Sequence, residues 1–156
     1  MSVNDIIEKQ DEIKSHSYDF ILWPEGWGKF KLRYEWKSHK LEESTTNNIP
    51  DQAGIYTLLI QPGIAGHPAC SYLMYVGRTK SLRRRFKDYL KKEKLSSGRP
   101  KIIRLLNKYS GYLWFCYITI EIENLQNTEE ELIAAYVPPC NDQIPARIHK
   151  VIGAFK

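Results

Sequence analysis

The sequence has no long hydrophobic run and few cysteines, and each absence excludes a class of protein. No apolar stretch approaches the roughly 18 residues that a membrane span requires, and the first residues lack the basic-then-apolar order of a secretory signal. The three cysteines, Cys70, Cys116 and Cys140, lie far apart and form no CxxC pair. We therefore expect no disulfide scaffold, no zinc site and no membrane partner, and the expected location is the cytoplasm.

Positive charge is unevenly distributed along the chain. The net charge of +5 is modest, but thirteen Lys or Arg residues lie between Arg78 and Lys108, against only Asp88 and Glu93. One face of the molecule is therefore expected to be strongly positive. Such a face suits a polyanion, because each neutralised phosphate releases condensed counterions. It equally suits a solvated helical surface, so the charge alone does not identify a nucleic-acid-binding protein.

The first 49 residues are expected to form an appendage. Val3, Ile6, Ile7 and Ile13 have near-helical spacing, which predicts a short amphipathic helix from residue 3 to about residue 15, packed on the rest of the protein. Between residues 18 and 37, aromatic residues alternate with basic ones around a Pro/Gly turn, which predicts a β-hairpin with one aromatic and one basic face. The aromatic face fits core packing, and the arm could contact DNA or mediate dimerisation.

A polar, turn-rich stretch at residues 42–50 predicts a linker, after which an α+β (α/β-class) domain is expected from residue 50 to 145. Apolar and β-branched segments at 54–60, 72–77 and 112–120 predict a small, mainly antiparallel three-stranded sheet. Helices are expected from a Ser81 cap to about Lys94, from Pro100 to about residue 110, and from a Thr128/Glu131 capping box to Pro138-Pro139. Residues 146–156 are expected to be a C-terminal tail.

Two charged residues fall on helix faces that should be buried. Arg85 lies three residues after Leu82 and four before Tyr89, on the apolar side of the helix expected from Ser81. Glu129 likewise precedes Leu132 and Ile133 by three and four residues. A buried charge is costly unless it is paired or functional. Two explanations fit: the side chains pair with each other or merely rim the core, or they belong to a cleft that hydrolyses phosphodiesters.

At these positions the sequence resembles the GIY-YIG nuclease family. Gly54-Ile55-Tyr56 matches the first signature, and Tyr75-Val76-Gly77 matches the second with Val for the central Ile. Residues 78–85 are similar to the nuclease module of the bacterial excision-repair incision subunit, whose catalytic Arg stands eight residues after the second Gly, as Arg85 does here. The family's metal-binding Glu precedes an apolar pair, a Pro and, twelve residues on, an Asn; Glu129, Leu132, Ile133, Pro138 and Asn141 match this order.

The resemblance, which covers roughly residues 50–144, implies a metal-dependent endonuclease. It implies catalytic roles for Tyr56, Tyr75, Arg85 and Glu129, with Mg²⁺ or Mn²⁺ held by Glu129. A single carboxylate suffices, because Mg²⁺ keeps several waters. Arg85 would bind the nonbridging phosphate oxygens, and either tyrosine would orient or deprotonate the attacking water. Which tyrosine does so stays open.

Further residues are expected to contact the substrate or to support the site. Tyr89 could line the cleft or belong to the core, and Asn141 could contact substrate or fix the final turn. The candidate substrate-binding residues are Arg78, Lys80, Arg84, Tyr89 and Asn141. The expected substrate is DNA, with RNA left open, and the enzyme could be of restriction, repair or phage type. A restriction-type enzyme would form a homodimer. The alternative is a protein that binds nucleic acid on the same scaffold without cutting it.

Overall fold

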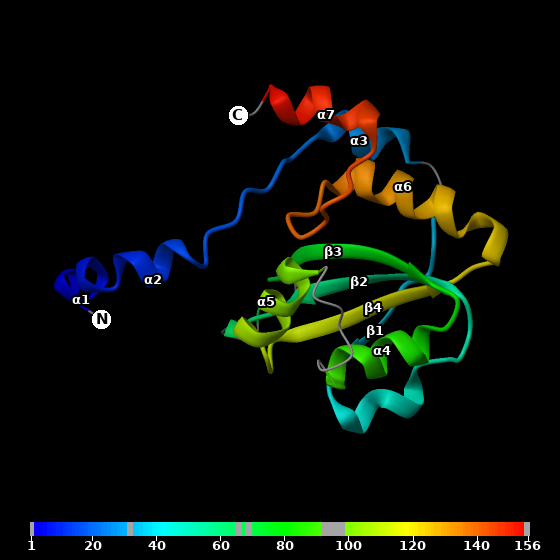
Figure 1. Cartoon of the computed structure of the whole chain (residues 1–156), viewed down its shortest axis with the longest axis horizontal. Helices are drawn as coiled ribbons and strands as arrows, with labels where there is room; N and C mark the ends of the chain where they lie inside the picture. The colour runs from blue at the N-terminus through cyan, green and yellow to red at the C-terminus, as the bar shows by residue number, and fades with distance from the viewer. Residues whose placement is uncertain (1, 31–32, 65–66, 68–69, 92–98, 155–156) are drawn as a thin grey trace.

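Four antiparallel strands form the central sheet of the computed structural model, which describes residues 2–30, 33–64, 67, 70–91 and 99–154 (Figure 1). The strands are β1 (Lys37–Lys40), β2 (Gly54–Ile60), β3 (Tyr72–Thr79) and β4 (Leu113–Thr119), in the order β1-β4-β2-β3. The predicted α+β class and the antiparallel pairing are confirmed. The predicted number of three strands is wrong, because the polar segment Lys37–Lys40 pairs with β4 through its backbone and has no apolar alternation that would reveal a strand.

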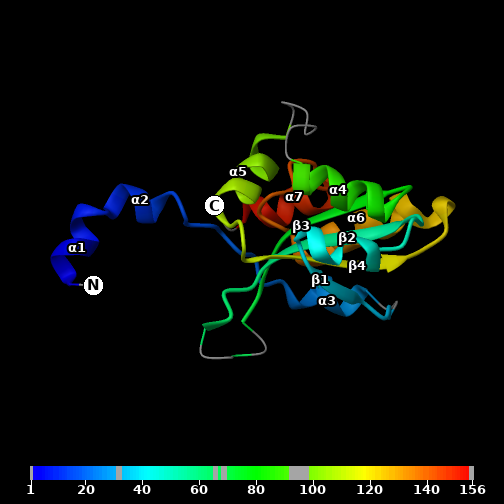
Figure 2. The same ribbon diagram turned by 90° about the horizontal axis from the view of Figure 1, so that it is seen from below.

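Helices cover both faces of this sheet. On one face, α4 (Leu82–Lys91) and α5 (Pro100–Lys108) pack on a core that includes Tyr56, Leu58 and Phe115. On the other, α6 (Leu125–Tyr136) packs through Leu132 and Ile133. Figure 2 shows α4 and α5 on one side of the sheet and α3 (Pro24–Lys29) on the other. None of the described helices is both long and apolar enough to span a bilayer.

Gly54, the first residue of β2, is required by close packing rather than by its backbone angles. A Cβ atom at this position would collide with the carbonyl oxygen of Ile118 in β4 and with the side chain of Leu82 in α4. The absence of a side chain therefore lets the start of β2 lie close to both neighbours. The first signature glycine thus fixes the distance between the sheet and the helix that carries Arg85.

The N-terminal helix differs from its prediction. It is divided into α1 (Val3–Glu8) and α2 (Gln10–Lys14), and no residue of either helix is buried. The expected packing on the rest of the protein is therefore wrong. Figures 1 and 2 show these helices projecting from the body as an arm. Its base is held by Lys108, whose Nζ donates to Ser15 O at 2.8 Å, and by a 3.0 Å hydrogen bond between His16 and Tyr109.

The predicted hairpin over residues 18–37 is not present in the described part of that range. Residues 24–29 form α3 instead, because Pro24 at the first helical turn favours a helix start and Trp23 and Phe30 lie beside α6 rather than across a strand pair. The expected linker is also structured. It contains a 3₁₀ helix, η1 (Glu43–Asn48), followed by the fully buried Ile49. Lys37–Lys40, which lies before this segment, pairs with β4 and so belongs to the sheet.

Two other predicted boundaries need correction. The expected C-terminal tail forms α7 (Ala146–Gly153), which buries Ile148 against Ala134 and Val137. The expected capping box is wrong, because α6 begins at Leu125 and buries Thr128 inside the helix. Burial of the apolar Leu125 side chain starts the helix one turn earlier than the capping pattern indicated.

The predicted helix after the second signature is confirmed over its described residues. The Arg84 backbone N–H donates to Ser81 Oγ at 3.2 Å, as expected for a Ser81 cap. Residues 92–94 of this predicted helix lie outside the described residues. The helix expected from Pro100 is confirmed as α5, and Pro138-Pro139 follow the end of α6 as predicted.

Candidate active site

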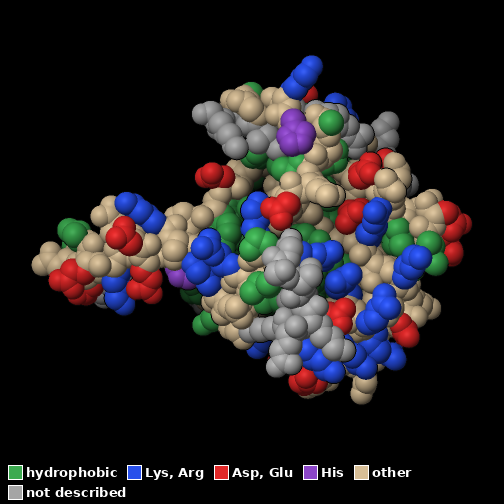
Figure 3. Space-filling model, in the orientation of Figure 1, with side chains coloured by type: hydrophobic (Ala, Val, Ile, Leu, Met, Phe, Trp, Pro, Cys, Tyr) green, Lys and Arg blue, Asp and Glu red, His purple; other side chains and the backbone are tan. Residues whose placement is uncertain are grey.

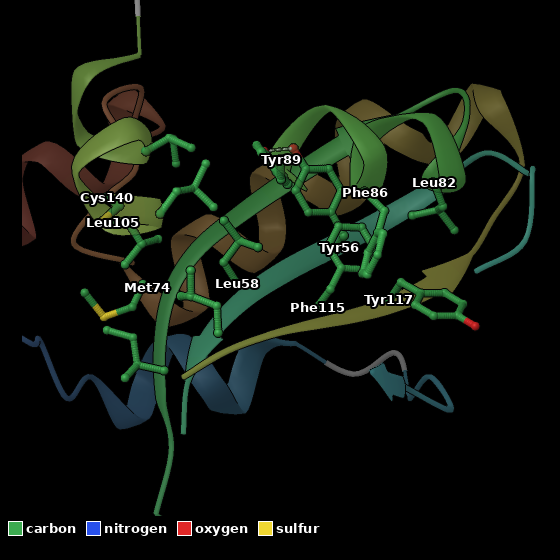
Figure 4. Packing of buried hydrophobic residues seen from close by; sticks show 14 of the residues in the cluster. Tyr56, Leu58, Met74, Leu82, Phe86, Tyr89, Leu105, Phe115, Tyr117 and Cys140 are labelled. Carbon is green, nitrogen blue, oxygen red and sulfur yellow. Dashed lines mark hydrogen bonds between the residues drawn. The ribbon is translucent and has the colours of Figure 1, made fainter. Parts of the chain in front are cut away.

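Tyr56, from the first signature, is buried in the aromatic core under α4. Its ring stacks on Phe115 with centroids 5.0 Å apart, and its hydroxyl shares a 2.7 Å hydrogen bond with Tyr89 (Figure 4). Tyr89 is fully buried as well. Burial raises the pKa of Tyr56 well above its ordinary value, and the neighbouring hydroxyls of Tyr89 and Tyr75 add to this. Tyr56 is therefore held neutral, with its hydroxyl already partnered.

Gly77, the last residue of the second signature, makes room for both signature tyrosines. It pairs directly with Tyr56 across β2 and β3. A Cβ atom here would collide with the ring and hydroxyl of Tyr56 and would lie 2.7 Å from Cε1 of Tyr75. The two signatures are thus coupled by packing, because the glycine of one leaves space for the tyrosine of the other.

Tyr75 lies on the edge strand and lines a cleft of about 720 Å³. The register between β2 and β3 shifts at this point, so that Met74 has no partner in β2 and Tyr75 pairs with Leu58. Such a bulge re-aims a side chain. Burial raises the pKa of Tyr75, and the charge of Arg99 acts against that rise, as does that of Arg85. Tyr75 is thus the signature tyrosine that is only partly buried.

Asn141 covers the open edge of β3. Its Oδ1 accepts from the backbone N–H of Val76 at 2.9 Å, and its Nδ2 donates to the carbonyl of Val76 at 2.8 Å. Next to it, the Cys140 N–H donates to Met74 O at 2.9 Å. The side chain thus takes the place of a neighbouring strand for one residue. Since both polar groups of Asn141 are engaged, we interpret it as a residue that positions Tyr75 rather than one that contacts substrate.

Replacing Asn141 with alanine is expected to destabilise the fold by about 2–3 kcal/mol, because the buried N–H and C=O of Val76 lose their partners together. Urea denaturation measures this difference. Gln143→Ala, an exposed amide two residues away, is the matched control and should cost little. Equal stability of the Asn141 and Gln143 variants would show that water replaces the two hydrogen bonds.

Glu129 projects from α6 into the same cleft. Its side chain is 19% exposed, and its Oε2 lies 3.2 Å from Nε of Arg78 on β3. Burial raises the pKa of Glu129, although the charge of Arg78 opposes the rise. The alternative in which Glu129 pairs with Arg85 is therefore wrong. The carboxylate instead faces the cleft between a cation and Tyr75, whose hydroxyl is close enough to be affected by its charge.

Arg85 is partly buried on α4, as periodicity predicted for the inner side of that helix. Its Nε is buried and has no hydrogen-bond partner among the described residues. Burial raises the pKa of Tyr56, Tyr75 and Tyr89, and the positive charge of Arg85 opposes that rise in each of them. The guanidinium group therefore lies beside the tyrosines and retains an unused donor.

The other predicted substrate contacts lie at different distances from the cleft. Arg78 lines it, whereas Lys80 and Arg84 are exposed outside its wall. Figure 3 shows Lys and Arg side chains gathered over the part of the surface where α4 lies. Lys80 and Arg84 thus belong to a basic surface beside the cleft rather than to its lining.

Arg99 lines the cleft, and the sequence interpretation gave it no role beyond its charge. It is the residue before Pro100, at the N-cap of α5. The signal available in the sequence was its position, because an N-cap is usually Ser, Thr, Asp or Asn, whose side chain accepts from the helix. An Arg there provides no such cap, so its side chain is available for another purpose.

The carboxylates of the cleft suit a hydrated magnesium ion better than zinc. In the described ranges, no three His, Cys, Asp or Glu side chains gather at one point. Zinc sites need at least three protein ligands, whereas Mg²⁺ keeps several waters and needs only one or two carboxylates. Glu129 is the carboxylate beside Tyr75. The residues present therefore fit Mg²⁺ held by Glu129 with water and substrate oxygens.

Comparisons with known proteins give structural likenesses only. No family model matches the chain, and no curated protein matches it. Solved structures of the endonuclease domain of UvrC from Thermotoga maritima do match. The magnesium-bound domain is 20% identical over 63% of this chain and 92% of its own, with a TM-score of 0.44. A point mutant bound to its catalytic divalent cation is 20% identical over 64% and 93%, with a TM-score of 0.45. Both structures are described as GIY-YIG domains, the family that the two signatures resemble.

Proposed function

We propose that this protein is a metal-dependent endonuclease of the GIY-YIG type, which hydrolyses phosphodiester bonds in DNA. One observation carries the proposal. Tyr56, Tyr75, Arg78, Arg99 and Glu129 line a single cleft. These are the groups that phosphodiester hydrolysis needs: a base, a carboxylate for a cation, and donors for phosphate oxygens.

Each residue has a part in the proposed hydrolysis. Glu129 would hold the divalent cation, which when bound supplies Lewis-acid stabilisation of the leaving oxygen and of the charge on phosphorus. Arg85 would donate its free Nε–H to nonbridging oxygens, because a guanidinium fork matches phosphate geometry. Tyr75 would orient the attacking water and accept its proton. The water oxygen then bonds to phosphorus while the bond to the leaving oxygen breaks.

The surroundings of the two signature tyrosines favour Tyr75 as the base. The hydroxyl of Tyr56 is buried and hydrogen-bonded to Tyr89, although Tyr56 also contributes to the lining of the cleft. Tyr75 lines the cleft, and the charges of Arg99 and Arg85 stabilise its deprotonated form. We therefore assign Tyr56 to positioning and Tyr75 to proton transfer.

A pH profile distinguishes the two tyrosines. Burial raises the pKa of Tyr75 above its ordinary value, so little tyrosinate exists at neutral pH and its fraction grows as the pH rises. The cleavage rate of the wild type is therefore expected to increase by about tenfold per pH unit between about pH 7 and 9. Tyr75→Phe should be slower by about 10²- to 10⁴-fold and lose this dependence, whereas Tyr56→Phe should keep it. A slope retained by Tyr75→Phe would assign the proton to another group.

The basic surface supports a nucleic acid as substrate. Arg84 and Lys87 are exposed on α4, and Lys80 is exposed at its start, next to the cleft. Phosphates that follow this surface would lead the backbone of DNA toward Tyr75 and Glu129. RNA carries the same phosphates, so it is tested as a second class of substrate.

Three points stay predictions: specificity of restriction, repair or phage type, homodimer formation, and a cytoplasmic location. The exposed apolar residues of the arm support self-association.

The proposal is tested by incubating the purified protein with supercoiled, linear and branched DNA, and with RNA, in Mg²⁺, Mn²⁺ or EDTA. Nicking that requires the divalent cation is the expected result. If the protein binds nucleic acid but nicks no substrate under any of these conditions, the enzyme proposal fails. The alternative, a protein that binds nucleic acid without cutting it, would then hold.

A further inference from the structure

Arg99 approaches the tyrosines from a different helix than Arg85 does. Arg85 belongs to α4, whereas Arg99 precedes α5, with φ −130° and ψ 58°, which lie outside the helical region. It lines the cleft together with Tyr56 and Tyr75, and its charge acts on the hydroxyls of Tyr75, Tyr56 and Tyr89. Arg99 also shares the lining of the cleft with Glu129. Two arginines therefore converge on the signature tyrosines.

Three neighbouring cations each have an oxygen partner, whereas the buried Nη1 of Arg99 has none among the described residues. Lys101 pairs with Asp142 at 2.8 Å, Arg78 pairs with Glu129, and Arg83 donates from Nε to the carbonyl of Ile49 at 2.7 Å. Within the described ranges Arg99 forms no ion pair, and its Nη1 is buried without an acceptor. A buried donor left unpaired costs about 1–3 kcal/mol.

A ligand that binds in the cleft and places a hydrogen-bond acceptor next to Nη1 of Arg99 would remove this cost. The ligand is expected to be anionic, because Arg99 forms no ion pair with a described carboxylate, although its charge acts on Glu129 in the same cleft. It must also reach Tyr75, because Tyr75 and Arg99 line the same cleft. A phosphodiester at the proposed point of cleavage meets both conditions, because its nonbridging oxygens carry the charge and lie next to the attacking water.

We propose that Arg99 binds a nonbridging oxygen of the scissile phosphate and forms, with Arg85, a clamp of two guanidinium groups. This inference rests on the proposed function and adds a catalytic residue to it. Arg99 forms no bond to the substrate and transfers no proton. Its contribution is electrostatic, because negative charge on the phosphate oxygens increases as the water bonds to phosphorus.

Single-turnover cleavage at saturating protein tests the clamp. Arg99→Ala is expected to slow the wild-type rate by about 10²-fold, as for the loss of one preorganised donor. Arg99→Lys should lose less, because it keeps the charge without the fork. Arg104→Ala removes the same charge from an exposed position on α5, so it should change affinity slightly and leave the saturated rate unaltered. Thermal melting confirms that each variant is folded.

A double-mutant cycle with Arg85→Ala gives an independent measurement. If the two guanidinium groups bind one phosphate, the double variant should lose less than the product of the two single losses. If the wild type cuts but Arg99→Ala cuts as fast as Arg104→Ala, the clamp is overturned and the proposed function stands. If the wild type does not cut at all, the proposed function fails and the clamp fails with it.

Discussion

Replacing Glu129 with glutamine is expected to reduce cleavage by at least about 10³-fold, because several kcal/mol of stabilisation from the bound cation would be lost. The variant should fold normally. Burial raises the pKa of Glu129, so the fold does not depend on its charge and accepts the neutral isostere. Single-turnover cleavage in Mg²⁺ measures the loss, and binding of DNA in EDTA should be unchanged or stronger.

Glu130→Gln is the matched control for this experiment. Glu130 follows Glu129 directly and also lines the cleft, but it is exposed and accepts a 3.0 Å hydrogen bond from Gln126. Its replacement should leave the cleavage rate close to that of the wild type, because surface substitutions usually have small effects. An equal loss in both variants would indicate that the cation depends on the acidic pair as a whole. Normal cleavage by Glu129→Gln would exclude the proposed metal site.

Replacing Arg85 with alanine is expected to lower the cleavage rate by about 10³- to 10⁵-fold, the range for an arginine that meets developing charge in phosphoryl transfer. The effect should appear in the rate at saturation rather than in affinity, because the residue lies beside the tyrosines and not on the exposed basic surface. Single-turnover rates at several protein concentrations separate the two quantities.

Lys87→Ala provides the comparison for Arg85, since Lys87 is exposed on the same helix two residues further along. Its loss should weaken binding at low salt and leave the saturated rate intact. If Arg85→Ala has the same saturated rate as the wild type, the guanidinium group has only a packing role. Urea denaturation would then show that the variant is less stable than the wild type.

The sequence predicted those parts of the fold in which apolar pattern and local signals agree. The two signature strands, the Ser81 cap and the start of α5 at Pro100 all combine burial with a recognisable terminus. The hairpin prediction failed because alternation of aromatic and basic residues fits a strand, whereas Pro24 and tertiary packing select a helix for residues 24–29. β1 was missed because its backbone pairs without any apolar side chain facing the core.

For the site, the sequence predicted only where each residue lies on its own helix or strand. Periodicity placed Arg85 and Glu129 on inner faces, and the structure has both partly buried. Periodicity gives no information on partners, so the pairing of Glu129 with Arg78 and the attachment of Asn141 to Val76 required the tertiary structure. Arg99 was missed for the same reason, because it precedes a helix and belongs to no face.

The ion pair between Arg78 and Glu129 has a consequence for the order of binding on the proposed function. A cation arriving at Glu129 must compete with the guanidinium group that lies 3.2 Å from its Oε2. Once displaced, Arg78 is free to bind a phosphate, and a phosphate that attracts Arg78 equally frees the carboxylate. Cation and nucleic acid should therefore raise each other's affinity by the same factor, as reciprocal linkage requires. The cation affinity of the free protein would accordingly be weaker than that of the complex in which cleavage occurs.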